Sequence, residues 1–460
     1  MNPLEVLVIS PHFPPTNAAD SQRVRFILPY LADADLNATV LAVSPASVRA
    51  PLDPWLEAGL ADTVPVHRVK GLGVGWCKVP SMGTLTNRAM GALRKVGSRL
   101  LSVARRDGRP FDLIYFSTTQ FGIHMLGPYW KRKFAVPFVM DYQDPWVNDY
   151  YAKYPEIVPP GGRLKYAISH WLAKQTEPSV LKHCSGITSV SSAYPKQLKD
   201  RYSFLTEQFP VLVAPFPGDE RDLERVRADT SISQSVFNPH DGCKHWIYIG
   251  RGGRDMEVAL RGFFAALRSR LQITADVTER GQKDVDTPSS LLSAQKLRIH
   301  FVGTSYASAG RGIKTVEPIA NEYGLQGVVV EHTDRIPYSQ TLRCLLDADA
   351  LIVPGSNDPG YTASKVYPYL LARKPMLAIF HESSSVADVI DRVGGATLVT
   401  FYSSENIDRL KKEILAKWFD GQAFAMAKPL NLDKFEVFTA RYQAKQLADF
   451  FSRVLEREQC

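Results

Sequence analysis

The stretch "VPFVMDYQDPWVNDYY", residues 136–151, places carboxylates and aromatic residues directly after a short apolar run. The run is rich in β-branched residues and predicts a strand buried on both faces, followed by a loop at its C-terminal end. Ligands bind at that edge of open α/β sheets, so Asp141 and Asp144 are candidates for acid–base chemistry. A structural interpretation is equally open, because Asp before Pro often starts a turn and Trp146 would then cover the edge of the core.

A second chemical signal is the stretch "WIYIGRGGRDMEVALRGFFAAL", residues 246–267, which predicts a strand, a glycine turn and a helix. Gly250 and Gly253 allow the backbone to approach a ligand closely, and the start of the helix offers free amides to an anion. Arg251 and Arg254 add charged, potentially bidentate donors for a diphosphate. The alternative is an ordinary strand-to-helix turn, since many such turns contain glycine.

A third signal follows the apolar run "ALIVP" and covers "GSNDPGYTASKVYPYLLARKPMLAIF", residues 355–380. Thr362 or Ser364 can cap a helix that begins near Lys365, so a second helix start would present amides, hydroxyls and an ammonium to an anion. Tyr361 could stack on a base or cover a sugar. The alternative is a capped helix with a solvated lysine. Two such helix starts in one domain favour a nucleotide diphosphate.

Two carboxylate pairs resemble metal motifs, the "DAD" runs at 33–35 and 347–349. A DxD pair can hold Mg²⁺ or Mn²⁺ against a nucleotide diphosphate. Each run, however, lies between a Leu-rich helical stretch and an apolar strand, where acids end one element and start the next. We therefore interpret both as structural and expect no metal and no other cofactor.

The elements that must position these residues alternate between strand and helix. Two series of short apolar strands are expected, one within 5–190 and one within 245–380, separated by a polar stretch. This pattern predicts an α/β protein of two doubly wound Rossmann-like domains facing across a cleft. The domains expected are 1–215, which binds the acceptor, a polar interdomain segment 216–244, a nucleotide-sugar domain 245–430, and a helix crossing back within 431–460. Residues 272–295 are expected to form a surface excursion.

Composition agrees with a two-domain globular protein. The chain has 460 residues, which is longer than one ordinary core. Of these residues 45% are hydrophobic and 22% are charged, as is normal for a globular protein. The five cysteines are scattered and lack CxxC spacing, which argues against a disulfide framework or a zinc site. The N-terminus leads straight into an apolar run, and no run is long enough to span a bilayer. We expect a cytoplasmic protein, free or peripheral on the inner membrane face.

The formal net charge of +8 is concentrated in residues 85–109, which hold seven Arg or Lys and one acid. Leu93, Val96, Leu100 and Ala104 recur there at helical spacing, so one face of the helix is apolar and the rest is cationic. Such a helix can lie on anionic lipid. The alternative is a crossover helix with a solvated basic face. No basic and aromatic residues interleave as in a nucleic-acid groove, so nucleic acid is not expected as a partner.

Three segments together resemble a known family. They are "VLVISPHFPPTNAADSQRVRFILPYL", "WIYIGRGGRDMEVALRGFF" and "DADALIVPGSNDPGYTASKVYPYLLARKPMLAI". They look like the N-terminal and donor-site segments of GT-B glycosyltransferases of the family-4-like kind, and the resemblance covers most of 1–215 and 245–400. A final amphipathic helix, 435–455, fits the segment that crosses back in such folds. The family transfers a sugar from a nucleotide diphosphate sugar, generally with retention and without a DxD metal.

The resemblance also implies roles for individual residues. Arg251 and the region of Arg254 would hold the diphosphate, and Ser364 and Lys365 would meet the distal phosphate or the sugar. The family commonly carries two donor-site glutamates eight residues apart, and the matching positions here are Gly360 and Pro368, which indicates an atypical branch.

On the acceptor side, the resemblance implies that Asp144 first, and Asp141 second, would orient or deprotonate the acceptor hydroxyl or stabilise charge on the sugar. Trp146 would form a platform for the acceptor. Asn17 stands in the loop where the family usually has a Gly-Gly pair, and we assign it to acceptor binding. The alternative for Asp141 is a structural tie between the strand end and a neighbouring loop.

The predicted function is therefore transfer of a sugar to a saccharide, lipid-linked or natural-product acceptor. Two alternatives remain. One is a catalytically silent GT-B binding or partner subunit, which the absent glutamates would make tolerable. The other is a nucleotide-sugar 2-epimerase, although such enzymes normally carry a carboxylate and histidine-rich site.

Overall fold

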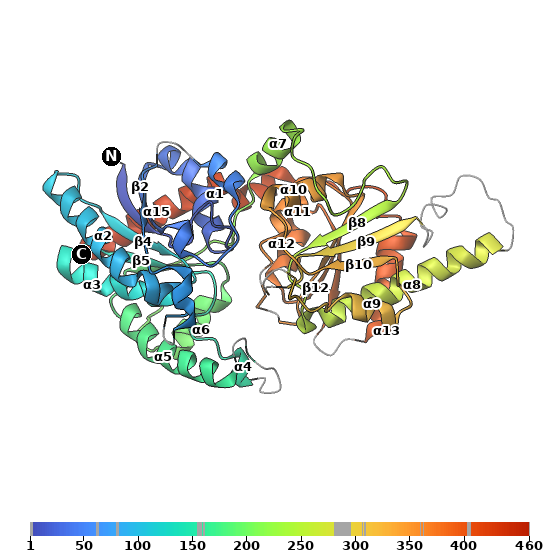
Figure 1. The fold of residues 1–460 in the computed structure, drawn as a ribbon, viewed down its shortest axis with the longest axis horizontal. Coiled ribbons are helices and arrows are strands. Elements are labelled where there is room, and N and C mark those ends of the chain that lie inside the picture. Colours follow the sequence, from blue (N-terminus) through green and yellow to red (C-terminus); the bar gives the residue numbers. More distant parts are fainter. Residues whose placement is uncertain are drawn as a thin grey trace. The chain divides into compact units, whose positions relative to one another are not determined.

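The computed structural model describes residues 3–60, 64–79, 82–153, 159, 162–279, 296–305, 307, 310–358, 360–361, 363–402 and 406–459. The chain forms two compact units. Unit 1 comprises Met1–Pro217 together with Phe438–Cys460, and unit 2 comprises Gly218–Val437. Each unit is built on one sheet (Figure 1).

The sheet of unit 1 has seven parallel strands in the order β3-β2-β1-β4-β5-β6-β7. Its strands are β1 (Leu4–Ile9), β2 (Leu36–Val43), β3 (Val66–Val69), β4 (Leu113–Ser117), β5 (Phe138–Tyr142), β6 (Gly186–Ser189) and β7 (Val211–Val213). The order of the strands reverses between β1 and β4. Loops after these strands therefore diverge to opposite sides and leave room for a ligand at the C-terminal edge.

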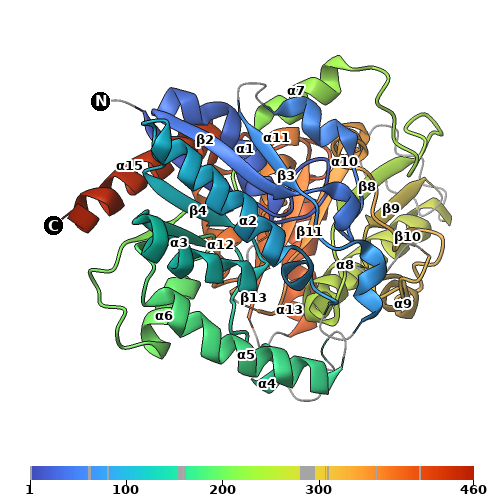
Figure 2. The same ribbon diagram turned by 60° about the vertical axis from the view of Figure 1, so that its left-hand side comes forward.

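Helices cover both faces of this sheet, as the alternation of side chains along each strand requires. Leu7 and Ile9 of β1 point into the core under α2, α3, α5 and α6, whereas Val6 and Val8 point into the core under α1 and α15. Figure 2 shows α2 and α3 lying over the strands. The helices are α1 (Ser21–Leu31), α2 (Leu85–Arg106), α3 (Leu126–Phe134), α4 (Tyr150–Lys153), α5 (Arg163–Leu181), α6 (Ala193–Arg201) and α15 (Ala440–Gln459).

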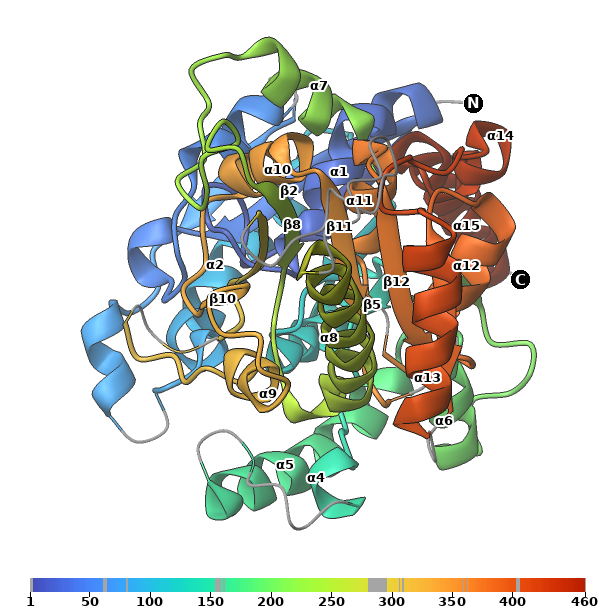
Figure 3. The same cartoon turned by 90° about the vertical axis from the view of Figure 1, so that its right-hand side faces the viewer.

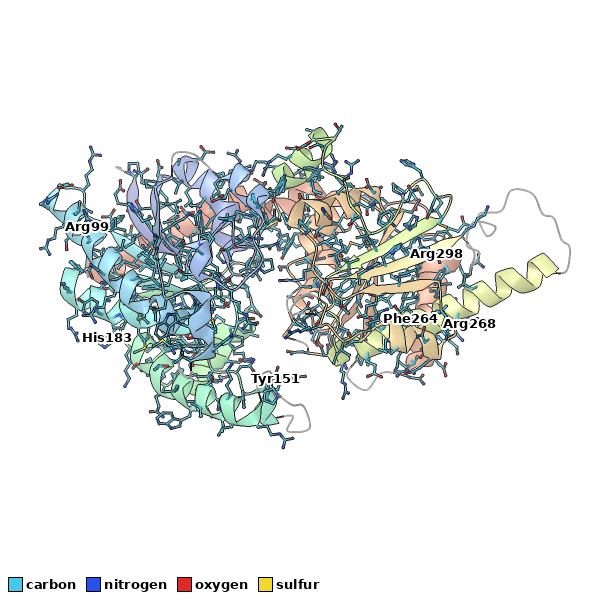
Figure 4. The ribbon with its side chains drawn as sticks, in the orientation of Figure 1. Arg99, Tyr151, His183, Phe264, Arg268 and Arg298 are labelled. Atoms are coloured by element: carbon cyan, nitrogen blue, oxygen red, sulfur yellow. The ribbon has the colours of Figure 1, made fainter. Side chains whose placement is uncertain are left out.

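Helix α2 contains most of the basic segment 85–109. Its apolar residues are taken into the core: Leu93 and Leu101 are buried, and a Cβ on Gly97 would lie 2.4 Å from the ring of Trp130. Most of its basic residues remain outside, as Arg99 illustrates in Figure 4. Arg88 is the exception, since it is buried and donates to the carbonyls of Ser47 and Leu72. The geometry matches a crossover helix with a solvated basic face, because the apolar stripe proposed to meet lipid packs against the sheet instead.

The sheet of unit 2 has six parallel strands in the order β10-β9-β8-β11-β12-β13, with its reversal between β8 and β11. Its strands are β8 (Lys244–Ile249), β9 (Leu297–Val302), β10 (Val329–His332), β11 (Ala350–Pro354), β12 (Met376–His381) and β13 (Thr397–Phe401). Its helices are α7 (Glu220–Ala228), α8 (Glu257–Glu279), α9 (Glu317–Glu322), α10 (Tyr338–Asp347), α11 (Val366–Ala372), α12 (Ser385–Val393), α13 (Ile407–Ile414) and α14 (Leu432–Phe435). Helices α8 and α13 lie side by side (Figure 3).

The predicted fold class is confirmed, because two parallel sheets form two Rossmann-like domains. Two details differ from the sequence-based expectations. The final helix, expected at 435–455, starts at Ala440, after the short α14 and a 3-10 turn. Residues 272–279 of the expected surface excursion continue helix α8, and the remainder, 280–295, lies outside the described residues.

Candidate active site

The phosphate-binding candidates of unit 2 come from two loops at the point where the strand order reverses. Strand β8 leads into Gly250–Gly253 and the 3-10 turn η6 (Arg254–Met256), and the neighbouring β11 leads into the loop before α11. Because the strands are parallel neighbours, both loops emerge at the same edge of the sheet. The backbone amide of Asn357 donates to the carbonyl of Asp255 at 2.6 Å and joins the two loops.

Lys365 occupies the centre of this edge. Its ammonium donates to the hydroxyl of Tyr248 at 2.7 Å and lies 4.6 Å from the centre of that ring. Burial first, and then the charges of Arg251 and Arg335, lower the pKa of Lys365 to about 7. Among the residues that the structure describes, no carboxylate lies within ion-pair distance of this ammonium. The lysine is thus a cation whose surroundings lack a bonded anion.

Gly250 makes room for this lysine. A Cβ added at Gly250 would lie 1.9 Å from the Lys365 Nζ atom, and its φ of 156° is rarely adopted by other residues. Gly252 is similarly enclosed, since its Cβ would lie 2.6 Å from the Thr315 Oγ1 atom. The glycine turn therefore lets Lys365 and the backbone share one small space. We call Tyr248, Gly250, Arg251, Asp255 and Lys365 the Lys365 site.

Arg251 is already paired in this structure. Its two terminal nitrogens contact the two Asp255 carboxylate oxygens at 2.8 and 2.7 Å, a fork-to-fork arrangement. The guanidinium also lies 4.8 Å from the centre of the Tyr361 ring. A bound diphosphate would therefore either share Arg251 with Asp255 or displace that carboxylate.

The other donor-site candidates of unit 2 are less enclosed. A Cβ at Gly253 would lie 2.4 Å from the Asp255 Oδ1 atom, so this glycine also adjoins the ion pair. Arg254 and Ser364 are exposed at the starts of their respective helical turns. Thr362 lies outside the described residues. The structure thus brings Gly250, Arg251, Gly253, Tyr361 and Lys365 together.

Unit 1 carries a buried polar network at the same kind of sheet edge. The Asp141 carboxylate at the end of β5 is ion-paired with the Arg23 Nε atom at 2.7 Å, and both side chains are buried. It also accepts hydrogen bonds from Ser117 at 3.0 Å, Gln143 at 2.8 Å and Thr188 at 2.8 Å. Asp141 therefore ties β5 to α1, β4 and β6, which is the structural alternative considered for it.

Asp144 follows three residues later and is exposed to solvent. Loss of hydration to the surrounding protein, and then repulsion from the Asp20 carboxylate, raise the pKa of Asp144 to about 6. Its neighbour Trp146 is half-buried and stacks on Phe121, with ring centres 5.6 Å apart and planes 10° apart. Trp146 therefore packs on the core with one side while part of its surface stays accessible.

The loop after β1 holds a histidine–aspartate pair, His12 and Asp20, that the sequence-based interpretation missed. The His12 Nδ1 atom lies 2.8 Å from the Asp20 Oδ1 atom. The second Asp20 oxygen accepts from the Thr118 hydroxyl at 3.0 Å, and from the amide and hydroxyl of Thr119 at 3.1 and 3.2 Å. Burial alone would raise the pKa of Asp20, but His12 and these hydrogen bonds outweigh it and lower that pKa. The charge of Asp20 fixes the His12 ring.

Asn17 and Asp149 of unit 1 both contact other segments of the chain. Asn17 is half-buried in the same loop, and its backbone amide donates to the Pro51 carbonyl at 2.8 Å. Asp149, at the end of the 136–151 stretch, contacts His170 at 2.7 Å, Arg201 at 3.0 Å and Lys174 at 3.7 Å. Asp149 is thus held by three potential cations.

The two DAD runs have structural partners. Asp347 is paired with Arg343 at 3.1 Å, Asp349 accepts from Lys244 and from the His245 amide, and Asp33 meets Arg441. Within the described part of the chain no group of three or more His, Cys, Asp or Glu side chains could hold a metal ion. No helix in the described ranges is long and apolar enough to cross a membrane.

Comparisons with known proteins identify the fold. No family model and no curated protein sequence matches this chain. Among solved structures, a UDP-forming α,α-trehalose-phosphate synthase from Burkholderia xenovorans aligns with a TM-score of 0.57 and 11% identity, covering 100% of both chains. The chain has the GT-B fold.

Two further GT-B structures align over nearly the whole chain. HepE of Anabaena, solved in complex with UDP-glucose, has a TM-score of 0.50 and 13% identity, covering 99% of this chain and 98% of its own. WaaG, a glycosyltransferase involved in lipopolysaccharide biosynthesis, has a TM-score of 0.50 and 12% identity with the same coverage. At such identities the likeness concerns the GT-B fold alone, and the chemistry must be argued from the residues.

Proposed function

We propose that this GT-B protein is a glycosyltransferase that moves a sugar from a nucleotide diphosphate sugar to a saccharide, lipid-linked or natural-product acceptor. The observation that carries the proposal is Lys365, a cation placed over Gly250 between two loops at the switch point, with no carboxylate of the described residues at ion-pair distance. A diphosphate would supply the missing anion and would raise the pKa of Lys365 above 7 on binding.

The donor would be held by unit 2. Lys365 and the backbone amides of the glycine turn would contact the phosphates, Arg251 would add a bidentate contact oriented by Asp255, and Tyr361 would cover the base or the sugar. The complex of HepE with UDP-glucose and the UDP-forming activity of the trehalose-phosphate synthase support a nucleotide diphosphate sugar as the donor class. As proposed, the reaction retains configuration and proceeds without a DxD-bound metal.

Unit 1 would supply the groups that act on the acceptor. A raised pKa of about 6 makes Asp144 a stronger base than an ordinary aspartate while it stays largely ionised at pH 7. Asp144 would orient or deprotonate the acceptor hydroxyl, and Trp146 and Asn17 would position the acceptor. His12, fixed by Asp20, is a second candidate base. Asp141 would act as a positioning residue, because its oxygens are occupied within the buried network.

A screen of nucleotide diphosphates by thermal shift, followed by turnover of the matching sugar donor, tests the proposal. We expect one base to raise the melting temperature of the wild-type protein and not that of Lys365→Gln. Release of the nucleotide diphosphate should then require an acceptor and should survive EDTA. Turnover without an acceptor would indicate an epimerase, binding without any turnover a silent subunit, and loss with EDTA restored by Mn²⁺ a missed metal site.

A further inference from the structure

Helix α5 carries a row of large apolar side chains on its solvent side. Leu164, Ile168, Trp171 and Leu172 are 76%, 53%, 62% and 48% exposed. Successive members of this set are four, three and one residues apart, which places all four on one side of the helix. Their side chains therefore form one continuous strip. We call these four residues the α5 apolar face. In Figure 4 the helix lies between the labelled Tyr151, just before it, and His183, just after its end.

The opposite side of α5 is already packed. Ala173, Val180 and Leu181 are buried, and the buried Glu177 is paired with Arg201 at 3.3 Å and accepts from the Tyr202 hydroxyl at 2.7 Å. A surface helix normally turns polar residues to solvent once its apolar stripe meets the core. One side of helix α5 is buried in the core, and the helix still exposes a second apolar face. That face therefore calls for a partner other than the core of unit 1.

Basic residues border the strip. Arg163, Lys165 and Lys174 are exposed, and the only acid in α5 is the buried Glu177. An apolar strip that contains Trp, is flanked by cations and has no exposed acid on its own helix matches the boundary between acyl chains and anionic headgroups. The nearby Asp149 is already held by Lys174, His170 and Arg201. A second copy of this chain fits less well, because a symmetric contact would bring like charges together.

We propose that the α5 apolar face docks on anionic lipid bilayers and holds the protein peripherally at a membrane surface. This assignment does not depend on the proposed transfer reaction. It also differs from a contact through residues 85–109, because Leu93 and Leu101 of α2 are buried under the sheet whereas the α5 apolar face is open.

The test is sedimentation of the full-length protein with vesicles of phosphatidylcholine alone, or of two parts phosphatidylcholine to one part phosphatidylglycerol. We expect binding to the anionic vesicles that weakens with salt, and a loss of at least about tenfold in Leu164→Gln/Ile168→Gln/Trp171→Gln, whose melting temperature should stay near wild type. Ile313→Ser/Met426→Ser removes two other large exposed apolar side chains, 81% and 77% exposed, and should bind like wild type. Arg163→Gln/Lys165→Gln should lose mainly the preference for phosphatidylglycerol.

Insertion of the helix itself has a separate readout. The tryptophan fluorescence change on adding vesicles should shrink in Trp171→Phe while sedimentation persists. The proposal is overturned if anionic vesicles do not bind the protein, if the triple variant binds as wild type, or if the fluorescence change is the same in Trp171→Phe. It is equally overturned if light scattering finds a dimer that the triple variant converts to a monomer without any lipid effect.

Discussion

Lys365 of unit 2 holds its ammonium in an unfavourable environment. A half-buried ammonium repelled by the charges of two arginines is disfavoured, and its pKa is therefore lowered to about 7. Tyr248 offers a hydroxyl dipole but no charge. Such a site favours binding of an anion, because the anion would stabilise the charged form of Lys365, which the surrounding protein leaves unfavourable.

This reasoning predicts a pH dependence for nucleotide diphosphate binding. The protonated lysine binds the anion, so affinity should fall as the pH rises above 7, by up to about tenfold per pH unit. Lys365→Arg keeps the charge at every pH and should bind with a flatter profile, whereas Lys365→Gln should bind weakly throughout. Titration calorimetry between pH 7 and 9 checks this. Equal slopes in the wild type and in Lys365→Arg would remove Lys365 from the binding step.

Asp144 allows a prediction about turnover. Its side chain has contact with solvent, so Asp144→Asn should preserve folding and donor affinity while turnover falls by ~10²–10⁴. The wild-type rate should also fall as the pH drops below about 6, since the carboxylate is then protonated, and the residual rate of the variant should lack that step.

The control for Asp144→Asn is Asp107→Asn, a carboxylate exposed at the end of α2. It should leave both turnover and melting temperature unchanged. If Asp144→Asn turns over within about threefold of wild type but melts earlier, this carboxylate has the turn-forming role instead of a catalytic one.

At the residue scale, the sequence indicated which loops carry the polar chemistry but not how their side chains pair. Glycines and arginines after an apolar run marked the turn at 250–254. The Arg251–Asp255 pair sits at ordinary i, i+4 spacing, and many such pairs on helices are only surface contacts. Asp20 meets Thr118 across 98 residues of sequence, a contact that only the packing of β1 beside β4 creates.

At the scale of elements, the buried Arg23–Asp141 pair holds helix α1 to the end of β5. Asp141→Asn retains the shape of the side chain but leaves the Arg23 charge buried without its counter-ion, so unit 1 should lose about 3–5 kcal/mol of stability. Urea unfolding followed by tryptophan fluorescence checks this. Asp149→Asn, in a carboxylate 33% exposed, should cost no more than about 1 kcal/mol. Equal losses in the two variants would contradict the ranking.

The glycine turn gives a second prediction at this scale. Gly250→Ala places a methyl group where the Lys365 Nζ atom lies, so the lysine must leave or the turn must move. We expect nucleotide diphosphate affinity to fall by at least about tenfold, the loss of one charged hydrogen bond. Gly91→Ala is the matched control, because its Cβ meets nothing within 4 Å on helix α2. It should leave binding unchanged and gain up to about 1 kcal/mol in stability.

Most elements could be predicted because parallel strands buried on both faces are short apolar runs. The strands β3, β7 and β13 are the ones that no apolar run marks. The first two are edge strands of four and three residues, and β13 alternates buried and half-buried positions, so none of them stands out as an apolar run. The partner of an amphipathic helix is harder to foresee. The apolar stripes of α2 and α5 both fit helical spacing, yet the first is buried and the second is open.

At the scale of the whole molecule, the two units differ in how many segments of the chain form them. Unit 2 is one continuous stretch, Gly218–Val437, whereas unit 1 needs the C-terminal segment Phe438–Cys460 to complete it. Helix α15 packs beside α1 over the same face of the sheet. The fold class was predictable from the two series of strands, but the dependence of unit 1 on the last helix follows from contacts more than 400 residues apart.

Deletion of residues 438–460 should therefore unfold unit 1 and spare unit 2. Leu447, Phe450, Phe451 and Val454 are each at most 5% exposed in the core between α15 and the sheet. Burying such a side chain contributes roughly 1.5–3 kcal/mol, so the four together match the roughly 5–15 kcal/mol that stabilises an ordinary domain. We expect the 1–437 chain to lose one calorimetric transition, to become sensitive to protease throughout 1–217, and to retain the second transition with its shift on nucleotide diphosphate. If both transitions persist in 1–437, helix α15 is dispensable. If both vanish, the stability of unit 2 depends on unit 1, and the Lys365 site cannot be studied apart from it.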